Sequence, residues 1–174
     1  LLIDWIHTPG ILKKESQLFI RAHYTDQKSG RFAKFAEQKN VVVDDNITLS
    51  DFFGDNWDPG IEETKKFTNL VYHCDILITV ASTLNLDAAC FDKPIVNVAF
   101  NVLHHPRTGK DLSPILYTED HCRWFLETGA VDMVFNEEEL KQSINTYLLN
   151  PKYKSEERKE LIDTLCYKVD GKSS

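Results

Sequence analysis

The residues best suited to chemistry lie in one short stretch, Ser82 to Asp87, where two hydroxyl side chains precede a carboxylate. The apolar, β-branched run before it, residues 76–81, predicts a buried strand that leads directly into a helix. The first NH groups of a helix lack intrahelical partners, so a phosphate fits at Ser82 and Thr83. Asp87 follows Thr83 by one helical turn, where its carboxylate can accept hydrogen bonds from a ribose diol. The structural alternative is that Ser82 or Thr83 caps the helix and that Asp87 is solvated.

A cation and an imidazole, Arg21 and His23, follow a second apolar run at residues 18–20. At the carboxyl end of a parallel strand, these side chains would face a phosphate held at the Ser82 helix. Charge-assisted donors there would stabilise a leaving diphosphate as its charge develops. The alternative is a solvated arginine and a loop histidine.

Two further candidates come later in the chain. His121 stands in the first turn of a helix predicted to begin at Thr118, and it is either a donor contact or a surface histidine. The stretch from His104 to Lys110 combines two imidazoles and a lysine with Arg107. Such a loop suits a lid over a sugar diphosphate, and an ordinary disordered surface loop is the alternative.

The sequence does not favour a metal site or a resident cofactor. Read as a calcium loop from Asp44, position six would be Leu49 rather than Gly and position twelve would be Asp55 rather than Glu. His104, His105, His121 and Cys122 are residue types that bind zinc, but their spacings match no familiar zinc-ligand pattern.

The composition indicates one packed domain over residues 1–174, because 42% of the 174 residues are hydrophobic and 27% are charged. Lys and Arg number 20 against 27 Asp and Glu, for a net charge of −7, and no segment concentrates basic charge. Nucleic acid is therefore disfavoured as the main ligand. No apolar run approaches the roughly 18 residues of a membrane span, and the first residues do not resemble a signal peptide. The expected location is the cytoplasm, including the inner face of the membrane.

The cysteines and the chain ends add two expectations. The four cysteines are widely spaced and form no Cys-x-x-Cys pair, which predicts buried free thiols in a reducing compartment. The chain begins at Leu1 and ends without a closing element. We therefore expect it to be a piece of a longer protein.

Apolar runs alternate with helical patterns along the chain. Strands are predicted at residues 18–20, 41–43, 76–81, 95–100 and 130–135. Helices are predicted over residues 58–74, 84–91, 118–129, 136–149 and 155–166. Asp58-Pro59 marks the start of the first helix, and Asn136 with Glu139 forms a capping-box-like start of the fourth. The second helix places Leu84, Ala88 and Phe91 on one face. Nearly wholly apolar strands that alternate with helices predict an α/β fold, a Rossmann-like doubly wound parallel sheet. Ligands of such sheets bind where strands end and helices begin, which is where the candidates above lie.

The stretch from Cys74 to Val98, CDILITVASTLNLDAACFDKPIVNV, resembles the donor-binding half of GT-B glycosyltransferases. It is also similar to their relatives, the nonhydrolysing UDP-N-acetylglucosamine 2-epimerases and the CDP-glycerol glycerophosphotransferases. Asp87 stands where this pattern usually has Glu, and Asp92 stands where it usually has Gly. The Arg21-Ala22-His23-Tyr24 segment is similar to the Arg-x-His-Pro strand end of bacterial surface-polysaccharide transferases, with Tyr24 in place of Pro. The segment from Glu157 to the end of the chain is similar to their closing segment.

The resemblance implies the nucleotide-sugar-binding domain of a glycosyltransferase that makes bacterial surface polysaccharide. It implies donor contacts from Ser82, Thr83 and Asp87, and an approach of Arg21 and His23 to the donor phosphates. An N-terminal domain outside this chain would hold the acceptor, a saccharide or a lipid-linked glycan. A UDP-sugar 2-epimerase or CDP-glycerol-type phosphotransferase domain with the same pocket and a non-catalytic α/β ligand-binding domain are the alternatives.

Overall fold

A computed structural model describes residues 1–23, 30–44, 60–118, 120–166 and 168–171. The chain divides into two compact units, Leu1–Leu70 and Val71–Ser174, and the boundary falls within helix α2 (Ile61–His73). The expectation of one domain over residues 1–174 stays a prediction. Across the described ranges, no helix has the length and apolar character needed to cross a membrane.

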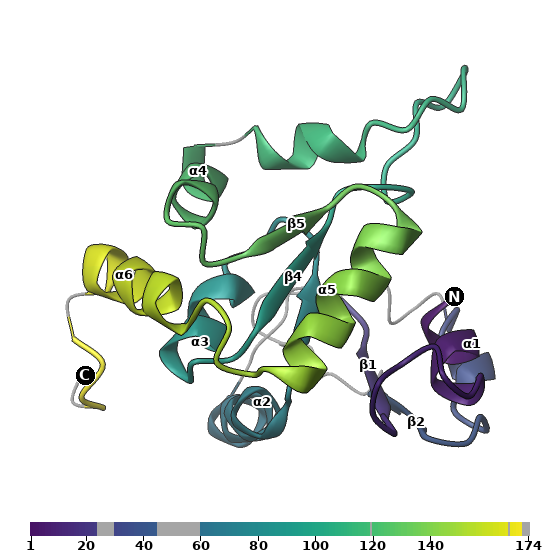
Figure 1. Cartoon of the computed structure of the whole chain (residues 1–174), viewed down its shortest axis with the longest axis horizontal. Helices are drawn as coiled ribbons and strands as arrows, with labels where there is room; N and C mark the ends of the chain where they lie inside the picture. Colours follow the sequence, from purple (N-terminus) through teal and green to yellow (C-terminus); the bar gives the residue numbers. More distant parts are fainter. Residues whose placement is uncertain (24–29, 45–59, 119, 167, 172–174) are drawn as a thin grey trace. The chain divides into compact units, whose positions relative to one another are not determined.

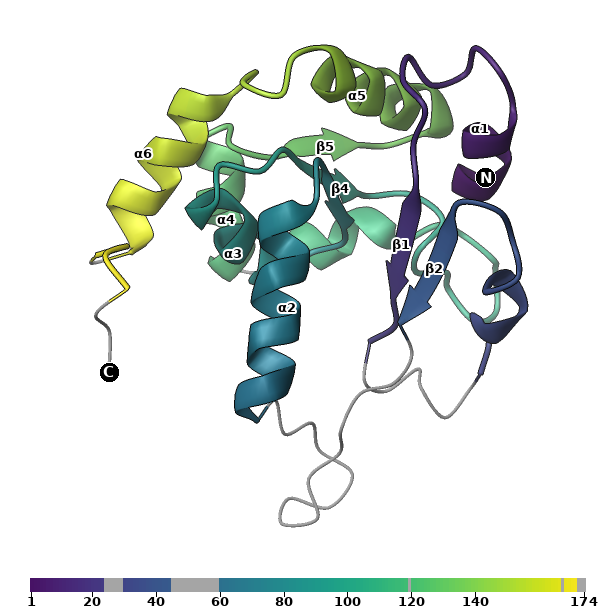
Figure 2. The same ribbon diagram turned by 90° about the horizontal axis from the view of Figure 1, so that it is seen from below.

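The first unit contains two parallel strands, β1 (Leu18–Arg21) and β2 (Val41–Asp44), which lie side by side (Figure 2). Their register places Arg21 opposite Asp44, so both strands end at the same level. Helix α1 (Leu2–His7), which the sequence patterns did not predict, packs against β1, and the short 3-10 helix η2 (Ala33–Phe35) packs against β2.

The second unit contains a parallel sheet of three strands in the order β3 (Leu77–Thr79), β4 (Ile95–Val98) and β5 (Asp132–Val134). Helix α3 (Leu84–Cys90) packs on β3 and β4, and helix α5 (Glu137–Leu149) packs on β4 and β5. The two helices cover opposite faces of this sheet (Figures 1 and 2). Between β4 and β5 the chain forms the 3-10 helix η3 (Ser113–Tyr117) and α4 (Asp120–Glu127), and α6 (Ser155–Leu165) follows α5.

The core of the second unit centres on β4, where Ile95 and Val96 are completely buried. These two residues explain why the strand reads as a continuous apolar run, since a central parallel strand has both faces covered. The predicted α/β class and the parallel pairing are confirmed. The described strands form two sheets, one in each unit, so a single doubly wound sheet stays a prediction.

The helix ends test the sequence signals directly. Asn136 caps α5 by accepting a 2.9 Å hydrogen bond from the Glu139 backbone NH, and the Glu139 carboxylate accepts one from the Phe135 NH at 2.8 Å. The predicted capping-box-like start is therefore confirmed, with the Glu139 carboxylate bonded to the NH of Phe135 rather than to that of the N-cap Asn136. The start predicted for α2, at Asp58-Pro59, lies outside the described residues.

The face predicted for α3, with Leu84, Ala88 and Phe91, is only partly the buried one, since Ala88 alone of the three is completely buried. Leu84 and Phe91 are only half-buried, whereas the buried residues of the helix are Asn85, Ala88 and Ala89. The physical reason is close packing: α3 contacts both the sheet and α6, and small alanine side chains allow the backbones to approach. The rotation of the helix that results buries Asn85.

Candidate functional site

The turn from β3 into α3 positions the best candidate residues at the carboxyl edge of the three-stranded sheet. Ser82 Oγ accepts a 3.2 Å hydrogen bond from the Leu84 NH, and the Ser82 carbonyl accepts one from the Asn85 NH at 3.3 Å. The Thr83 carbonyl accepts a 2.9 Å bond from the Leu86 NH. These bonds satisfy the first NH groups of α3 within the turn, so these groups are not left for a phosphate. Ser82, the residue before the N-cap Thr83, therefore satisfies one NH group of the first turn, and its own hydroxyl hydrogen remains able to donate elsewhere.

Thr83 and Asp87 both have exposed side chains one helical turn apart. Thr83 has helical dihedral angles, φ −64° and ψ −14°, so the spacing of these two residues is that of a continuous helix. Although the Asp87 side chain reaches solvent, partial desolvation by neighbouring atoms raises the pKa of its carboxyl. A hydroxyl donor and a carboxylate acceptor thus face solvent directly after a strand of a parallel sheet.

The structure also buries two asparagines, one in α3 and one in β4, which the sequence analysis did not single out. Asn85, in the first turn of α3, and Asn97, in the central strand β4, are both completely buried. Within the described part of the chain, neither side-chain amide has a hydrogen-bond partner. An unsatisfied buried polar group costs about 1–3 kcal/mol. For Asn97, the sequence does indicate an unusual position, because its amide interrupts the apolar run of β4. No comparable pattern indicates that Asn85 is buried.

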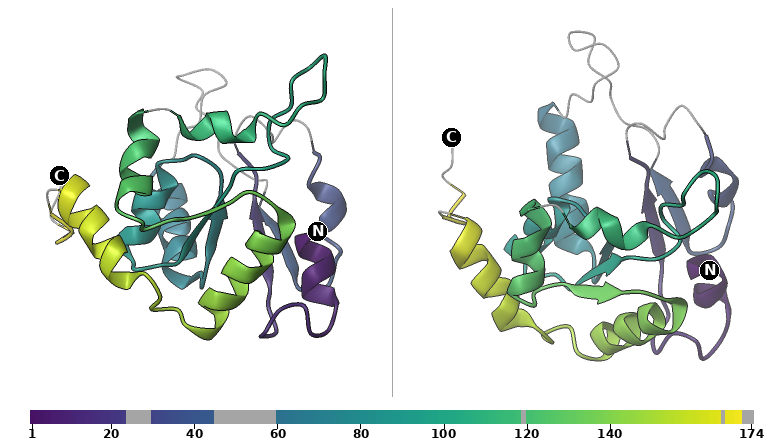
Figure 3. Two further views of the ribbon diagram at one scale, coloured as in Figure 1. Left: turned by 45° about the horizontal axis from the view of Figure 1, so that its top comes forward. Right: turned by 90° about the horizontal axis from the view of Figure 1, so that it is seen from above.

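The loop from His104 to Lys110 forms an ordered hairpin. His104 and Asp111 pair as an isolated antiparallel β-bridge. Next to this bridge, the His105 NH donates to the Lys110 carbonyl at 2.8 Å and the Leu112 NH donates to the Leu103 carbonyl at 2.7 Å. The hairpin extends away from the sheet (Figure 3), and Arg107 is exposed in it. The guanidinium of Arg107 thus lies on a hydrogen-bonded hairpin that follows the central strand β4.

Asp111 fixes the base of this hairpin. Its Oδ1 accepts hydrogen bonds from the Ser113 hydroxyl at 2.5 Å and the Ser113 NH at 2.8 Å, and its Oδ2 accepts one from the Asn101 NH at 2.8 Å. These bonds favour the charged carboxylate and lower the pKa of Asp111 to about 2.

Arg21 lies in the first unit, where an ion-pair cluster holds its guanidinium. Nη1 donates to Asp44 Oδ2 at 2.7 Å and Nη2 donates to Glu63 Oε1 at 2.5 Å. Lys66 Nζ donates to Asp44 Oδ1 at 2.6 Å, and the Phe67 ring centre lies 5.5 Å from the guanidinium carbon. Sequence reasoning missed Glu63, because only the placement of α2 brings this residue to the end of β1.

The other predicted residues are placed as follows. His23 is exposed just after β1. His121 belongs to α4, and its side chain lies outside the described residues, as do Tyr24, Asp45 and Asn46. Arg21 and His23 belong to the first unit and the other candidates to the second, so the meeting of these two groups at one ligand stays a prediction.

No metal centre stands out in the ranges that the structure describes: no three His, Cys, Asp or Glu side chains gather there to hold an ion. Comparisons of the chain with protein-family models, curated proteins and solved structures find no match. The assignment of a function therefore rests on the residues and their geometry.

One residue after α3 has an unusual backbone conformation. Asp92 has a φ of +52°, a conformation that glycine adopts most easily. Its carboxylate accepts hydrogen bonds from Lys152 Nζ at 2.6 Å, Ser155 Oγ at 2.8 Å and Arg158 Nε at 2.8 Å. Partial burial favours the neutral form of Asp92, but these donors outweigh that effect and lower the pKa of the carboxyl. The structure thus stabilises an aspartate where the backbone suits a glycine.

Proposed function

We propose that this chain is the donor-binding part of a GT-B-type glycosyltransferase and that it binds the nucleoside diphosphate of a nucleotide sugar. The observation that carries the proposal is the exposed Thr83–Asp87 pair, which follows β3 directly at the carboxyl edge of a parallel sheet. Ligands of such sheets bind at this edge. The left-handed backbone at Asp92 adds support, since it suits the glycine of the family pattern.

Each side chain has a defined task in this proposal. The hydroxyl groups of Ser82 and Thr83 donate to the diphosphate, and Arg107 and His121 add donors from the segment after β4. The Asp87 carboxylate accepts from the two ribose hydroxyls, and the partial desolvation that raises its pKa also strengthens such bonds. The NH groups at the start of α3 are already bonded, so the side chains carry the binding.

In sugar transfer, the proposed role of Arg21 and His23 is to stabilise the leaving diphosphate, whose negative charge increases as the glycosidic bond breaks. Arg21 must then exchange at least one of its two carboxylate partners for a phosphate oxygen. A further domain supplies the acceptor saccharide or lipid-linked glycan, and the reaction takes place in the cytoplasm or at the inner face of the membrane. The proposed fold is one half of a GT-B enzyme, with its parallel strands in a doubly wound sheet.

Titration calorimetry with UDP, CDP and GDP at millimolar concentration tests the proposal. At least one of these nucleotides should bind, and Asp87→Ala should weaken that binding about tenfold or more, as expected for a lost charge-assisted hydrogen bond. The matched control is Asp163→Ala, which removes an exposed aspartate of α6 and should leave the affinity unchanged. The absence of heat with all three nucleotides, or equal effects of the two substitutions, would contradict the proposal.

The same residues could serve a UDP-sugar 2-epimerase or a CDP-glycerol-type phosphotransferase, and product analysis with a protein that joins this chain to an acceptor domain separates these reactions. Transfer of a sugar to an acceptor supports the glycosyltransferase. An epimerised nucleotide sugar would instead indicate the 2-epimerase, and a transferred glycerol phosphate would indicate the phosphotransferase. Binding without any turnover would favour a non-catalytic ligand-binding domain.

A further inference from the structure

We propose that Cys90 and Cys166 form a reversible disulfide that ties the end of α6 to the end of α3. This inference is independent of the proposed nucleotide site. It starts from the position of the two residues: Cys90 is the last residue of α3, and Cys166 is the residue that caps the carboxyl end of α6. The two helices pack against each other.

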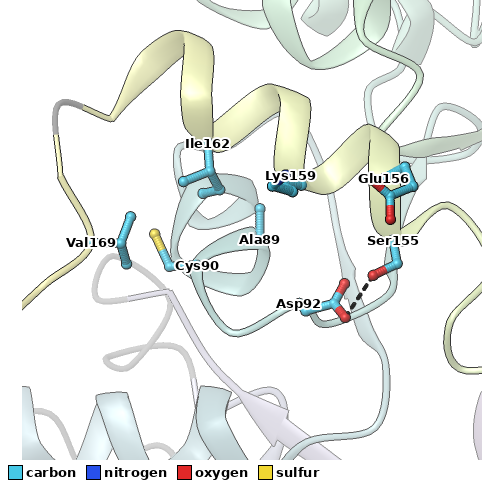
Figure 4. A pocket seen from close by; sticks show the side chains of 8 residues that line it. All are labelled: Ala89, Cys90, Asp92, Ser155, Glu156, Lys159, Ile162 and Val169. Atoms are coloured by element: carbon cyan, nitrogen blue, oxygen red, sulfur yellow. Dashed lines mark hydrogen bonds between the residues drawn. The ribbon is translucent and has the colours of Figure 1, made fainter.

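A cavity of about 280 Å³ between these helices makes Cys90 accessible. Figure 4 shows the Cys90 side chain at this cavity, with Ile162 of α6 and Val169 of the following segment beside it. Cys90 and Cys166 are both half-buried rather than enclosed in the core. A small thiol reagent can therefore reach the pair without unfolding of the unit.

The two thiols are also neighbours: Ile162 and Val169, which precede and follow Cys166 in sequence, line the same cavity as Cys90, and Cys166 contributes to the raised pKa of the Cys90 thiol. The other cysteines have different surroundings: Cys74 is half-buried and its Sγ lies 3.2 Å from the Val71 carbonyl oxygen, and Cys122 is completely buried. The expectation of four buried thiols is thus wrong for three of them. The pair combines a neighbouring thiol with access from solvent.

The environment of Cys90 sets the order of the reaction. Desolvation, the neighbouring Cys166 and the charge of Asp87 raise the pKa of the Cys90 thiol to about 11, so Cys90 is protonated at neutral pH. Since the thiolate is the nucleophile, Cys90 is a poor first nucleophile, and the proposal assigns the first attack on an oxidant to Cys166. Cys90 then acts as the resolving cysteine.

The oxidant is a small-molecule disulfide. The Cys166 thiolate attacks one sulfur of that disulfide, which forms a mixed disulfide and releases one small thiolate. Cys90 loses its proton to solvent, and its sulfur attacks Cys166 Sγ, which forms the protein disulfide and releases the second small thiolate. The two protein thiols lose two electrons in total, and the small disulfide gains them as it becomes two thiols.

The test is to expose the full chain, folded and in buffer, to oxidised glutathione, block the remaining thiols with an alkylating reagent and identify the linked peptides after non-reducing digestion. We expect one reducible link between the Cys90 and Cys166 peptides. Cys90→Ser should instead accumulate glutathione on Cys166, and Cys166→Ser should form no link. Cys74→Ser is the matched control and should form the link as the unsubstituted chain does.

A thermal melt gives a second measurement that does not depend on peptide recovery. The oxidised chain should melt several degrees above the reduced chain, because the disulfide constrains the unfolded state, and this shift should vanish in Cys90→Ser. Recovery of Cys90 and Cys166 only as alkylated or singly glutathionylated residues would overturn the proposal. A link that forms only in denaturant, or one that joins Cys74 or Cys122, would do the same.

Discussion

Arg21 and Asp44 face each other at the carboxyl ends of β1 and β2 and form an ion pair with a 2.7 Å distance between Nη1 and Oδ2. The parallel register creates this pair, because it aligns the last residues of both strands. Both side chains are largely buried, with 17% and 7% of their surface exposed. The strand ends that sequence reasoning selects as a ligand site therefore have a structural role in holding the first unit together.

Arg21→Ala should destabilise the first unit. The substitution leaves the carboxylates of Asp44 and Glu63 with Lys66 as the remaining cation of the cluster, and breaking a buried pair costs about 3 kcal/mol or more. Arg21→Lys should cost less, because it keeps the charge but cannot bond both carboxylates through one planar group. Urea unfolding followed by circular dichroism measures both effects.

The control for this experiment is Arg123→Ala, which removes the exposed Arg123–Glu127 pair of α4. Such a surface pair contributes about 0.5 kcal/mol or less. If Arg21→Ala lowers the free energy of unfolding no more than Arg123→Ala does, the ion-pair cluster does not stabilise the first unit. A loss of transfer activity in Arg21→Ala can be assigned to the leaving diphosphate only after this stability effect is known.

Asp92 allows the backbone and the side chain to be tested separately. Asp92→Ala and Asp92→Gly both leave the fully buried Arg158 without its carboxylate, so both should lower the free energy of unfolding by about 3 kcal/mol. Asp92→Gly should nevertheless be the more stable of the two by about 1 kcal/mol, because glycine adopts a φ of +52° without strain. Thermal melts of the two variants measure the difference. An alanine variant as stable as the glycine variant would show that the left-handed backbone relaxes on substitution.

Asp111 predicts a specific pH dependence for the hairpin after β4. Its pKa of about 2 lies below the value of about 4 for an unfolded chain, so its hydrogen bonds to Ser113 and Asn101 add stability above about pH 4. This contribution should be lost as the pH falls from about 4 toward 2. The carboxyl carbon shift of Asp111, followed by NMR through that range, should have its midpoint near 2, and the Asn101 NH signal should move with it. A midpoint near 4 would mean that these bonds do not hold the carboxylate.

The local parts of the fold were predictable, because short-range signals determine them. The apolar runs at β1 to β5 gave five strands in the right places, each bounded by turn or helix signals, and the Asn136–Glu139 pair gave the start of α5. Helix α1 was missed because Leu2–His7 carries no cap signal of its own; no side-chain hydrogen bond caps its N-terminus. The division into two units depends on contacts distant in sequence, which composition and periodicity do not encode.

For the candidate site, the sequence predicts which residues follow the strands but not the hydrogen bonds that they form. Ser82, Thr83 and Asp87 do follow a strand and open a helix, but the hydrogen bond from the Leu84 NH to Ser82 Oγ could not be foreseen from residue types. Likewise, the burial of Asn85 depends on how α3 rotates against the sheet and α6. Sequence patterns thus placed the candidate residues at strand ends, whereas tertiary packing determined which of their donors and acceptors remain available.

The most direct test of the central claim is to measure whether Asp87 recognises a ribose diol. The affinities of wild type and Asp87→Ala are measured by calorimetry for the nucleoside diphosphate that binds best and for its 2′,3′-dideoxy analogue. The account predicts that removal of the diol weakens wild-type binding about tenfold or more and leaves Asp87→Ala binding unchanged, since the two changes remove the same hydrogen bonds. Independent, additive losses, or equal affinity of the wild type for both nucleotides, would contradict it.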